Sequence, residues 1–397
     1  MPERPLEGIL VADFSRVLAG PLATMTLADL GARVIKVERP GLGDDTRYWG
    51  PPFSETGTTY FDSVNRNKES LCLDLTDPHD LDLALELAIR ADVVVENFKP
   101  GGMNKLGLDY EKLATRNPGL IYASISGFGD REGAELPGYD FIVQALGGLM
   151  SITGEAEHDP TKVGVALVDV LTAKDTTIGI LAALTARQHS GLGAHLKMNL
   201  LSSLQGGLAN QVQAFLGAGT VPARMGNEHP SIVPYQLLDA GDGPLAVACG
   251  NDSQFAKLSS VLGSPELAAD PRFASNAARV AHRAELIPLL ETALAGAPAA
   301  HWQSQLSAAG VPAGKVGGID DGLAYAESLG LNPTINVLDR DGKVVGRQVR
   351  HPITWEPEFS VKRDAPPQLG QDSDTIISWL AKSSHRSSTI QKAGQTP

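Results

Sequence analysis

The chain of 397 residues has only two cysteines, Cys72 and Cys249, too few for a disulfide framework or a structural zinc site. Each is therefore expected to be a buried, reduced thiol. Positive charge is also scarce, and the formal net charge of −13 argues against wholesale nucleic-acid binding, although a local pocket could still hold an anionic ligand. No window has the length of a membrane span, and the start, MPERPLEGILVADF, predicts no signal peptide. These absences predict a cytoplasmic protein without membrane contact.

The common signatures of catalysis and cofactor binding are missing too. There is no GxxxxGK[ST] phosphate loop, no HExxH pair and no GxSxG elbow, so neither a metal site nor a standard nucleophile is predicted. The first expected strand–helix turn reads SRVLAGP and lacks GxGxxG, although Glu38 stands where a ribose-binding acid would follow the second strand. A dinucleotide-dependent oxidoreductase is therefore an alternative that the missing glycines argue against.

The first half of the chain alternates short apolar runs with amphipathic segments. The pattern predicts strands over 8–13, 34–38, 71–75, 92–96 and 120–126, with helices over 20–30 and 81–90. Apolar strands joined by helices are typical of a doubly wound parallel sheet, so the expected fold class is α/β. Ligands of such sheets bind beyond the carboxyl ends of the strands, which here carry Asp13-Phe14-Ser15-Arg16, Glu38-Arg39, Glu96-Asn97-Phe98 and Ser126-Gly127-Phe128.

The composition changes near residue 201, where glycines become frequent. Residues 201–230 are predicted to be a linker, and 231–318 a smaller unit with strands and Ala/Leu-rich helices. Residues 319–382 are expected to contain a second linker with a hairpin at Asp341-Gly342 and a closing helix near 374–381. The polar tail 383–397 is expected to be disordered.

One carboxylate is singled out by its position, because the apolar run of VGVALVDVLTAKDTT (163–177) leads directly to Asp169. A strong helix pattern follows over 172–188. An Asp at such a junction accepts the free N–H groups of the first helical turn, and spacing alone favours this capping role. The positive helix end also favours an ionised carboxylate at pH 7, which suits a nucleophile toward a thioester. The residues by themselves leave both roles open.

Several motifs then form a recognisable series. They are RVLAGPLATMTLADLGARVIKVERPGLGDDTR (16–47), VENFKPGGMNKLGLDY (95–110), SISGFG (124–129) and the Asp169 segment, followed by stretches from NDSQFAKLSSVLG to PPQLGQDSD. In this order they resemble the class III CoA-transferase family, which includes formyl-CoA transferases, carnitine CoA-transferases and 2-methylacyl-CoA racemases. The resemblance covers nearly the whole chain.

The resemblance implies a Rossmann-like large domain built from both chain ends, with a smaller α+β domain inserted between them. The first part of the large domain is then expected over 1–200, and the chain returns to it within 319–382. The resemblance also implies an interlocked homodimer, in which each subunit threads through a ring formed by the other. The glycine-rich linkers would be the crossings of that ring.

For Asp169 the resemblance implies the role of nucleophile. Its carboxylate would attack the thioester of an acyl-CoA, giving a mixed anhydride and then an aspartyl-CoA thioester, from which an acceptor acid takes the CoA. Succinyl-CoA or another dicarboxylyl-CoA is the expected donor, with Arg272 and Arg279 as weaker candidates for holding its second carboxylate. CoA is expected as a substrate and a small carboxylic acid as the acceptor, with no permanently bound cofactor.

Two further residues are expected beside the nucleophile. Asp140, in GYDFIVQ (138–144), matches an acidic position of the family that would raise the basicity of the nucleophile or orient the CoA thiol; its structural alternative is a helix cap. Gly250 would offer a backbone N–H to the developing oxyanion. The short CGND segment there differs from the longer glycine loop of formyl-CoA transferases and argues against formate and oxalate.

The CoA contacts implied by the resemblance come from three strand ends. Lys105 stands where formyl-CoA transferases carry Arg, so the charge is kept without the bidentate geometry. Arg47 and Lys68 rank lower, because most such cations are solvated surface charges. The expected CoA-binding residues are Val17, Leu18, Ala19, Arg39, Asn97, Phe98, Lys99, Lys105 and Tyr139.

Tyr139 also separates two activities. Racemases of the family have Gly-His-Asp where this chain has Gly138-Tyr139-Asp140, and the His moves a proton at the α-carbon. Tyr, with a reference pKa of about 10, is a poor base near neutrality. CoA transfer is therefore the leading interpretation, with a 2-methylacyl-CoA racemase and a non-catalytic CoA-binding protein as alternatives.

Overall fold

The computed structural model describes residues 3–392, with side chains to Lys382, and divides into two compact units. Unit 1 consists of Met1–Leu149, Val163–Leu216 and Asn332–Pro397, and unit 2 of Met150–Lys162 and Gly217–Leu331. Both ends of the chain thus contribute to unit 1, and most of unit 2 is inserted between them.

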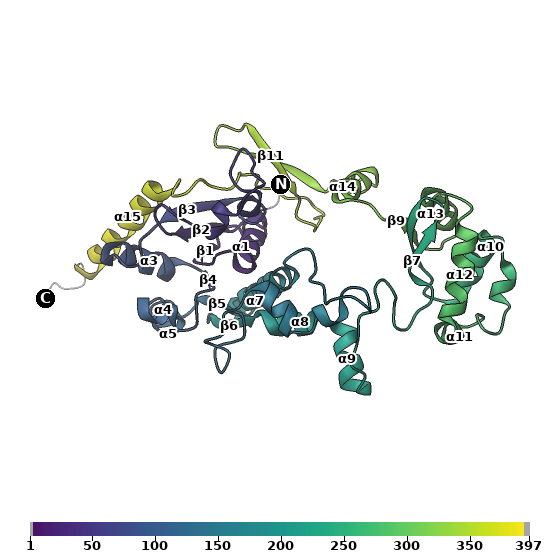
Figure 1. Cartoon of the computed structure of the whole chain (residues 1–397). Helices are drawn as coiled ribbons and strands as arrows, with labels where there is room; N and C mark the ends of the chain where they lie inside the picture. The colour runs from purple at the N-terminus through teal and green to yellow at the C-terminus, as the bar shows by residue number, and fades with distance from the viewer. Residues whose placement is uncertain (1–2, 393–397) are drawn as a thin grey trace. The chain divides into compact units, whose positions relative to one another are not determined.

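A six-stranded parallel sheet organises unit 1, in the order β3-β2-β1-β4-β5-β6 (Figure 1). This is the order of doubly wound nucleotide-binding folds, in which the direction of strand addition reverses between β1 and β4. The expected α/β class is confirmed, but the sixth strand was not predicted, because its sequence AHLKMN mixes polar with apolar residues. The strands are β1 (Leu10–Asp13), β2 (Arg33–Glu38), β3 (Lys68–Cys72), β4 (Val93–Glu96), β5 (Ile121–Ser126) and β6 (Ala194–Asn199).

Helices cover both faces of this sheet. On one face α1 (Ala19–Asp29) packs against α7 (Leu167–Ser190), and on the other α3 (Pro78–Arg90) packs against α15 (Ser373–Lys392) (Figure 1). The C-terminal segment also protects the edge strand β3, because Ser70 N donates to Asp372 Oδ2 at 2.9 Å and Cys72 N to Ser373 Oγ at 3.0 Å.

Two segments differ from the expectation. The predicted linker 201–230 contains most of α8 (Leu200–Gly207) and all of α9 (Ala209–Ala218), because its first glycines lie at helix ends and do not interrupt the helices. The predicted disordered tail is helical as far as Lys392, where the sequence has no Gly or Pro before Gly394, and 393–397 lie outside the described residues. The hairpin at Asp341-Gly342 is present between β10 (Thr334–Leu338) and β11 (Val344–Val349).

The remaining helices of unit 1 are short and lie at the strand ends. Within the described residues, no helix is long and apolar enough to cross a membrane. The short helices that matter for the site are α2 (Thr59–Asp62), α4 (Gly102–Leu106), α5 (Tyr110–Arg116) and α6 (Asp140–Leu146).

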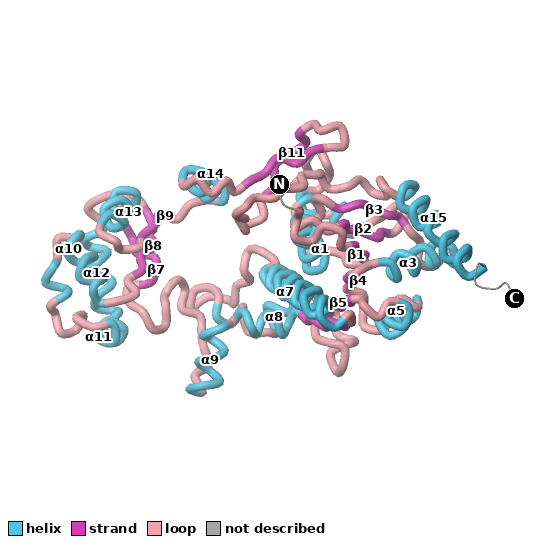
Figure 2. The backbone as a smooth tube through the Cα atoms, turned by 180° about the vertical axis from the view of Figure 1, so that it is seen from behind, coloured by secondary structure: helices cyan, strands magenta, loops and turns pink. Residues whose placement is uncertain are grey.

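Unit 2 is a small α+β unit with its own core. Its antiparallel sheet has the order β7-β8-β9, and helices pack on it (Figure 2). Phe255, Phe273, Leu290 and Leu306 are buried between the sheet and the helices. The elements are β7 (Tyr235–Ala240), β8 (Gly243–Ala248), β9 (Ala313–Lys315), α10 (Asp252–Val261), α11 (Asn276–Ala281), α12 (Arg283–Leu294), α13 (Ala299–Ala308) and α14 (Ile319–Ser328).

Candidate active site

A cavity of about 350 Å³ lies at the carboxyl ends of β1, β4 and β5 in unit 1. This is the edge where the strand order reverses and where ligands of doubly wound sheets bind. The first turns of α6 and α7 complete the wall. Most of the predicted site residues line it, namely Val17, Leu18, Ala19, Asn97, Phe98, Lys99, Tyr139, Asp140 and Asp169.

Asp169 lies inside the first turn of α7, because this helix begins at Leu167 and not at the predicted residue 172. The N-cap residue is Ala166, whose side chain offers no oxygen. In its place Asp140 Oδ1 accepts hydrogen bonds from Val168 N at 2.8 Å and from Asp169 N at 3.2 Å. Asp140 therefore has the capping role that the sequence had suggested for Asp169.

Gln144 holds Asp140 in this position. Its Nε2 donates to Asp140 Oδ2 at 2.6 Å, while its Oε1 accepts from Val163 N at 2.9 Å. The side chain is buried, so these bonds are shielded from water. Sequence reasoning missed Gln144, although its spacing of four residues from Asp140 on one helix was an available signal.

The neighbouring charge of Asp140 acts on the carboxylate of Asp169. Burial, and then the charge of Asp140, raise the pKa of Asp169 to about 7. Among the described residues no cation pairs with either carboxylate, so no positive charge offsets this repulsion. Asp169 is then about half ionised at pH 7, less than its position at a helix end alone predicts.

Tyr60 on α2 was not selected from the sequence, yet the charges of Asp169 and Asp140 act on its hydroxyl. Burial raises its pKa to about 12, with Asp169 and Asp140 adding to the effect. The phenol therefore stays protonated and able to donate a hydrogen bond. Trp49 packs edge-on against its ring, with the ring centroids 5.2 Å apart.

Asn97, which follows β4, is hydrogen-bonded to the loop that follows β1. Arg16 N donates to Asn97 Oδ1 at 2.9 Å, and Asn97 Nδ2 donates to Arg16 O at 2.8 Å. The guanidinium of Arg16 lies over the ring of Phe98, 5.7 Å from its centroid. Asn97 thus shapes the β1–α1 loop with both ends of its amide.

The other predicted residues lie elsewhere. Arg39 lines a neighbouring cavity of about 280 Å³, which shares Arg16 and Phe98 with the first. Lys99 pairs with Glu135, and Lys105 is exposed on α4 and lines neither cavity. Gly250 belongs to unit 2, where its N–H already donates to Gln254 Oε1 at 2.8 Å.

The cations that ranked lower all have structural partners. Lys68 is buried 3.1 Å from Asp13, and Arg279 is buried in unit 2 with its guanidinium 2.8 Å from Asp252. Arg272 pairs with Asp270 and Glu285.

Glu38 would bind the ribose if the protein were a dinucleotide-dependent oxidoreductase. Its carboxylate also has structural partners. Its carboxylate accepts hydrogen bonds from Nε and Nη2 of Arg47, at 2.8 and 2.7 Å, and from the Ser70 hydroxyl at 2.7 Å. Because these bonds and burial leave it little access to a ligand, the dinucleotide alternative loses its one supporting residue.

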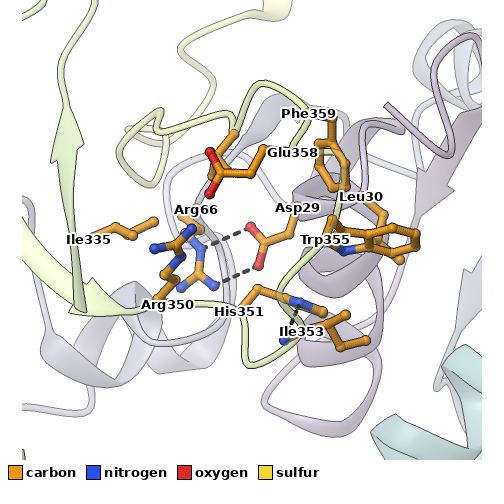
Figure 3. Close-up of a pocket in the computed structure, with 11 residues that line it drawn as sticks. Asp29, Leu30, Arg66, Ile335, Arg350, His351, Ile353, Trp355, Glu358 and Phe359 are labelled. Atoms are coloured by element: carbon orange, nitrogen blue, oxygen red, sulfur yellow. Dashed lines mark hydrogen bonds and ion pairs between the residues drawn. The ribbon is translucent and has the colours of Figure 1, made fainter. Parts of the chain in front are cut away.

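Another hollow in unit 1 lies between the end of α1 and the segment 335–361 (Figure 3). The guanidinium of Arg66 forms a fork with Asp29, with bonds of 2.9 and 2.6 Å, and Trp355 packs against Phe359 at a centroid distance of 5.3 Å. None of the predicted site residues lines this hollow.

Comparison with known proteins agrees with this geometry. Residues 6–373 match the family model described as CoA-transferase family III. An acetyl-CoA:oxalate CoA-transferase from Acetobacter aceti is 44% identical over 348 residues, which cover 87% of this chain and 88% of that protein. A succinate–glutarate CoA-transferase from Agrobacterium fabrum is 42% identical over 390 residues, covering 96% and 97%. The crystal structure of a CaiB/BaiF family protein from Brucella suis, 44% identical, matches with a TM-score of 0.85 over 96% of this chain and 100% of that one. The chain therefore belongs to the class III CoA-transferase family, as its motifs predict.

Proposed function

We propose that the protein transfers CoA from an acyl-CoA, succinyl-CoA or another dicarboxylyl-CoA, to a carboxylic acid, with Asp169 as the covalent nucleophile. The observation that carries the proposal is a carboxylate in the wall of the cavity whose pKa is raised to about 7 by burial and Asp140. Such a carboxylate is a stronger nucleophile than an ordinary one and still ionises near neutral pH. Relatives named for oxalate and for succinate and glutarate agree with acids of this class.

The chemistry needs no general base. An oxygen of Asp169 attacks the thioester carbonyl, the C–S bond breaks, and CoA leaves as a thiolate while a mixed anhydride forms. The thiolate then attacks the side-chain carbonyl carbon of Asp169, the anhydride C–O bond breaks, and the donor acid leaves as a carboxylate. The acceptor carboxylate reverses both steps, so no proton changes hands.

The acyl-CoA would span the two adjoining cavities. We assign the nucleotide to the Arg39 cavity, whose apolar wall includes Phe14 and Leu75, and the thioester to the cavity of Asp169. Lys99 and Lys105 are the proposed phosphate contacts. A Tyr at 139, where racemases have His, favours transfer over racemisation.

The proposed assembly is the interlocked homodimer of the family. It would make the water-poor surroundings that an anhydride needs, since hydrolysis competes with return of the thioester. Mass measurement of the native protein tests this part independently of activity, and a monomer would contradict it.

The test is an exchange assay with trapping. Succinyl-CoA or acetyl-CoA is incubated with a panel of acids that includes glutarate, succinate and oxalate, and new acyl-CoA products are measured by mass spectrometry. Oxalate is included because of the Acetobacter aceti relative, although the CGND segment argues against it. Hydroxylamine added during turnover should leave a hydroxamate on Asp169.

Asp169→Ala should abolish both exchange and trapping, whereas Asp175→Asn, an exposed carboxylate on the same helix, should retain both. Exchange with no acid in the panel, or an unmodified Asp169 during turnover, would contradict the proposal. Deuterium uptake at the α-carbon without an acceptor acid would indicate a racemase instead.

A further inference from the structure

The loop between β1 and α1 contains an unusual backbone conformation. Val17, in the wall of the Asp169 cavity, has a φ of +71°. A β-branched side chain is strongly disfavoured in this left-handed region, because its branches crowd the backbone. The conformation therefore persists only if the surroundings hold the loop in place.

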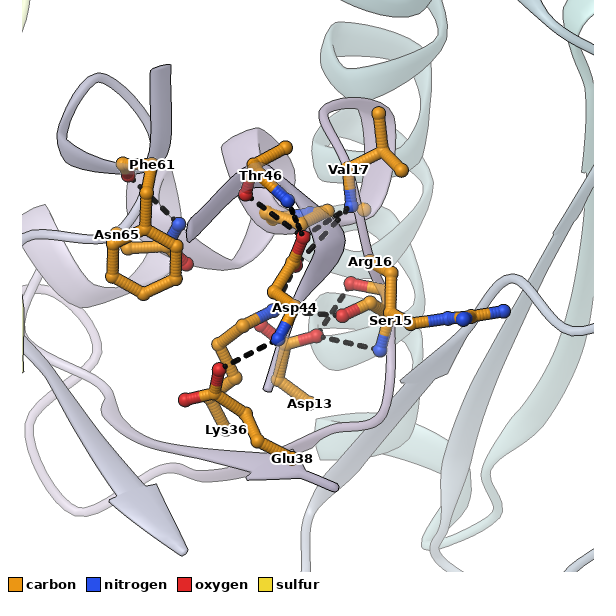
Figure 4. Close-up of polar contacts among 12 residues, drawn as sticks. Asp13, Ser15, Arg16, Val17, Lys36, Glu38, Asp44, Thr46, Phe61 and Asn65 are labelled. Carbon is orange, nitrogen blue, oxygen red and sulfur yellow. Dashed lines mark hydrogen bonds and ion pairs between the residues drawn. The ribbon is translucent and has the colours of Figure 1, made fainter. Parts of the chain in front are cut away.

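A buried ion pair provides that hold (Figure 4). Val17 N donates to the carboxylate of Asp44, 3.3 and 3.2 Å from its two oxygens. The ammonium of Lys36 lies 2.9 Å from the same carboxylate and donates to Ser15 O at 2.8 Å. The pair thus contacts the loop on both sides of Arg16, and both of its side chains have 0% exposure.

Asp44 is itself fixed in orientation. Its Oδ1 accepts from Thr46 N at 3.0 Å and from the Thr46 hydroxyl at 2.8 Å, and its own N–H donates to Glu38 Oε2 at 3.1 Å. Burial alone would raise the pKa of Asp44, but Lys36 and these hydrogen bonds lower it to about 2. The carboxylate is therefore charged at every pH at which the protein would work.

We infer that Asp44 and Lys36 are positioning residues for acyl-CoA, which keep Val17 in its left-handed conformation and so hold the Arg16–Ala19 wall ready for the ligand. This rests on the proposed function, because the ligand of that wall is taken to be CoA. The ion pair lies behind the loop and acts on the ligand only through it. A purely structural pair would affect folding but would leave the affinity for CoA unchanged.

Variants of Asp44 and Val17, alone and combined, distinguish a positioning role from a purely structural one. Asp44→Asn keeps the size of the side chain and one acceptor oxygen but removes the charge, and it should weaken CoA binding about tenfold. Glycine adopts a positive φ without crowding, so Val17→Gly in the Asp44→Asn background should recover most of that loss. Affinity for CoA is measured by calorimetry, with thermal unfolding in parallel.

Two further variants keep the test decisive. Thr46→Val removes one hydrogen bond to Asp44 and should weaken CoA binding about threefold even if Asp44→Asn fails to fold. Arg66→Met breaks another buried pair of unit 1, with Asp29, which makes no hydrogen bond to residues 15–19, and should lower stability but not affinity.

Three results would overturn the inference. The first is a folded Asp44→Asn variant that binds CoA as the unchanged protein does. The second is a double variant that binds no better than Asp44→Asn. The third is an equal loss of affinity in Arg66→Met. If the unchanged protein itself does not bind CoA, the proposed function fails as well, so the two failures are distinguishable.

Discussion

Two clusters of carboxylates lie at the same edge of the unit 1 sheet, and their partners differ completely. In the first, Asp13, Asp44 and Glu38 are buried against Lys68, Lys36 and Arg47 respectively. In the second, Asp140 and Asp169 line one cavity, and no cation among the described residues pairs with them. Burial penalises ionisation in both, yet the pKa of Asp44 is lowered to about 2 and that of Asp169 is raised to about 7.

Since burial raises the pKa in both clusters, the presence or absence of a cation decides whether the carboxylate ends with a lowered or a raised pKa. A paired carboxylate has its lone pairs engaged by cations and hydrogen-bond donors, so it is rigid and chemically inert. Asp140 is engaged in this way by Gln144 and by the start of α7, whereas the carboxylate of Asp169 accepts no hydrogen bond from the described residues. The first cluster shapes the walls of the site, and the second provides the reactive group.

Breaking a pair in the first cluster should give the largest effect on stability. Lys68→Met leaves Asp13 buried without its nearest cation, and we expect a loss of about 3–5 kcal/mol in the free energy of unfolding. Chemical denaturation measures it.

The matched controls are a double variant and an exposed pair. Adding Asp13→Asn should recover part of the loss, because the uncompensated charge is then removed. Lys197→Met breaks the exposed pair with Asp130 and should cost less than about 1 kcal/mol. A loss as small for Lys68→Met as for Lys197→Met would show that the first cluster is not held by its pairing.

Removing the charge of Asp169, in the second cluster, should raise the free energy of unfolding, whereas breaking a pair in the first cluster lowers it. The folded state raises the pKa of Asp169 to about 7 from its ordinary value near 4, so it binds the proton more tightly than the unfolded chain does. The ionised form therefore destabilises the fold increasingly as pH rises through 7. At pH 8 we expect Asp169→Asn to be more stable than the unchanged protein by about 2–4 kcal/mol, although it is inactive.

The advantage should shrink as pH falls toward 5, because folded Asp169 is then already neutral. Denaturation at both pH values measures the change, and Asp175→Asn serves as the exposed control on the same helix. A pH-independent difference would mean that Asp169 is not the titrating group.

The sequence predicted the elements whose signal is local. Continuous apolar runs such as DVVVE and LIYASIS identified β4 and β5, whereas β6 was missed because its residues alternate between polar and apolar. The Asp169 helix was expected to start too late, because the run VGVALV resembles a strand and its true start depends on a cap from another helix.

The partners within the site could not be predicted in the same way. Asp140 contacts Val168, 28 residues further along the chain, and Lys68 reaches Asp13 across 55 residues. Such contacts depend on how the strands are ordered in the sheet, which the spacing of charges in the sequence does not encode. Motif resemblance identified Asp140 and Asp169 as a pair, but only the contacts show that one caps the helix and the other is left unpaired.

The smallest expected effect tests the coupling between these two carboxylates. Burial is the larger cause of the raised pKa of Asp169, and the charge of Asp140 is the second. Asp140→Asn removes that charge while keeping an oxygen that can accept from Val168 N. The acidic limb of kcat/KM against pH, which follows ionisation of Asp169, should therefore move down by about one pH unit from near 7 and stay above the ordinary range of an Asp. The rate above the limb should fall, because a less basic carboxylate is a weaker nucleophile. If the limb stays in place while the melting temperature falls, Asp140 is only a helix cap, and the raised pKa of Asp169 rests on burial alone.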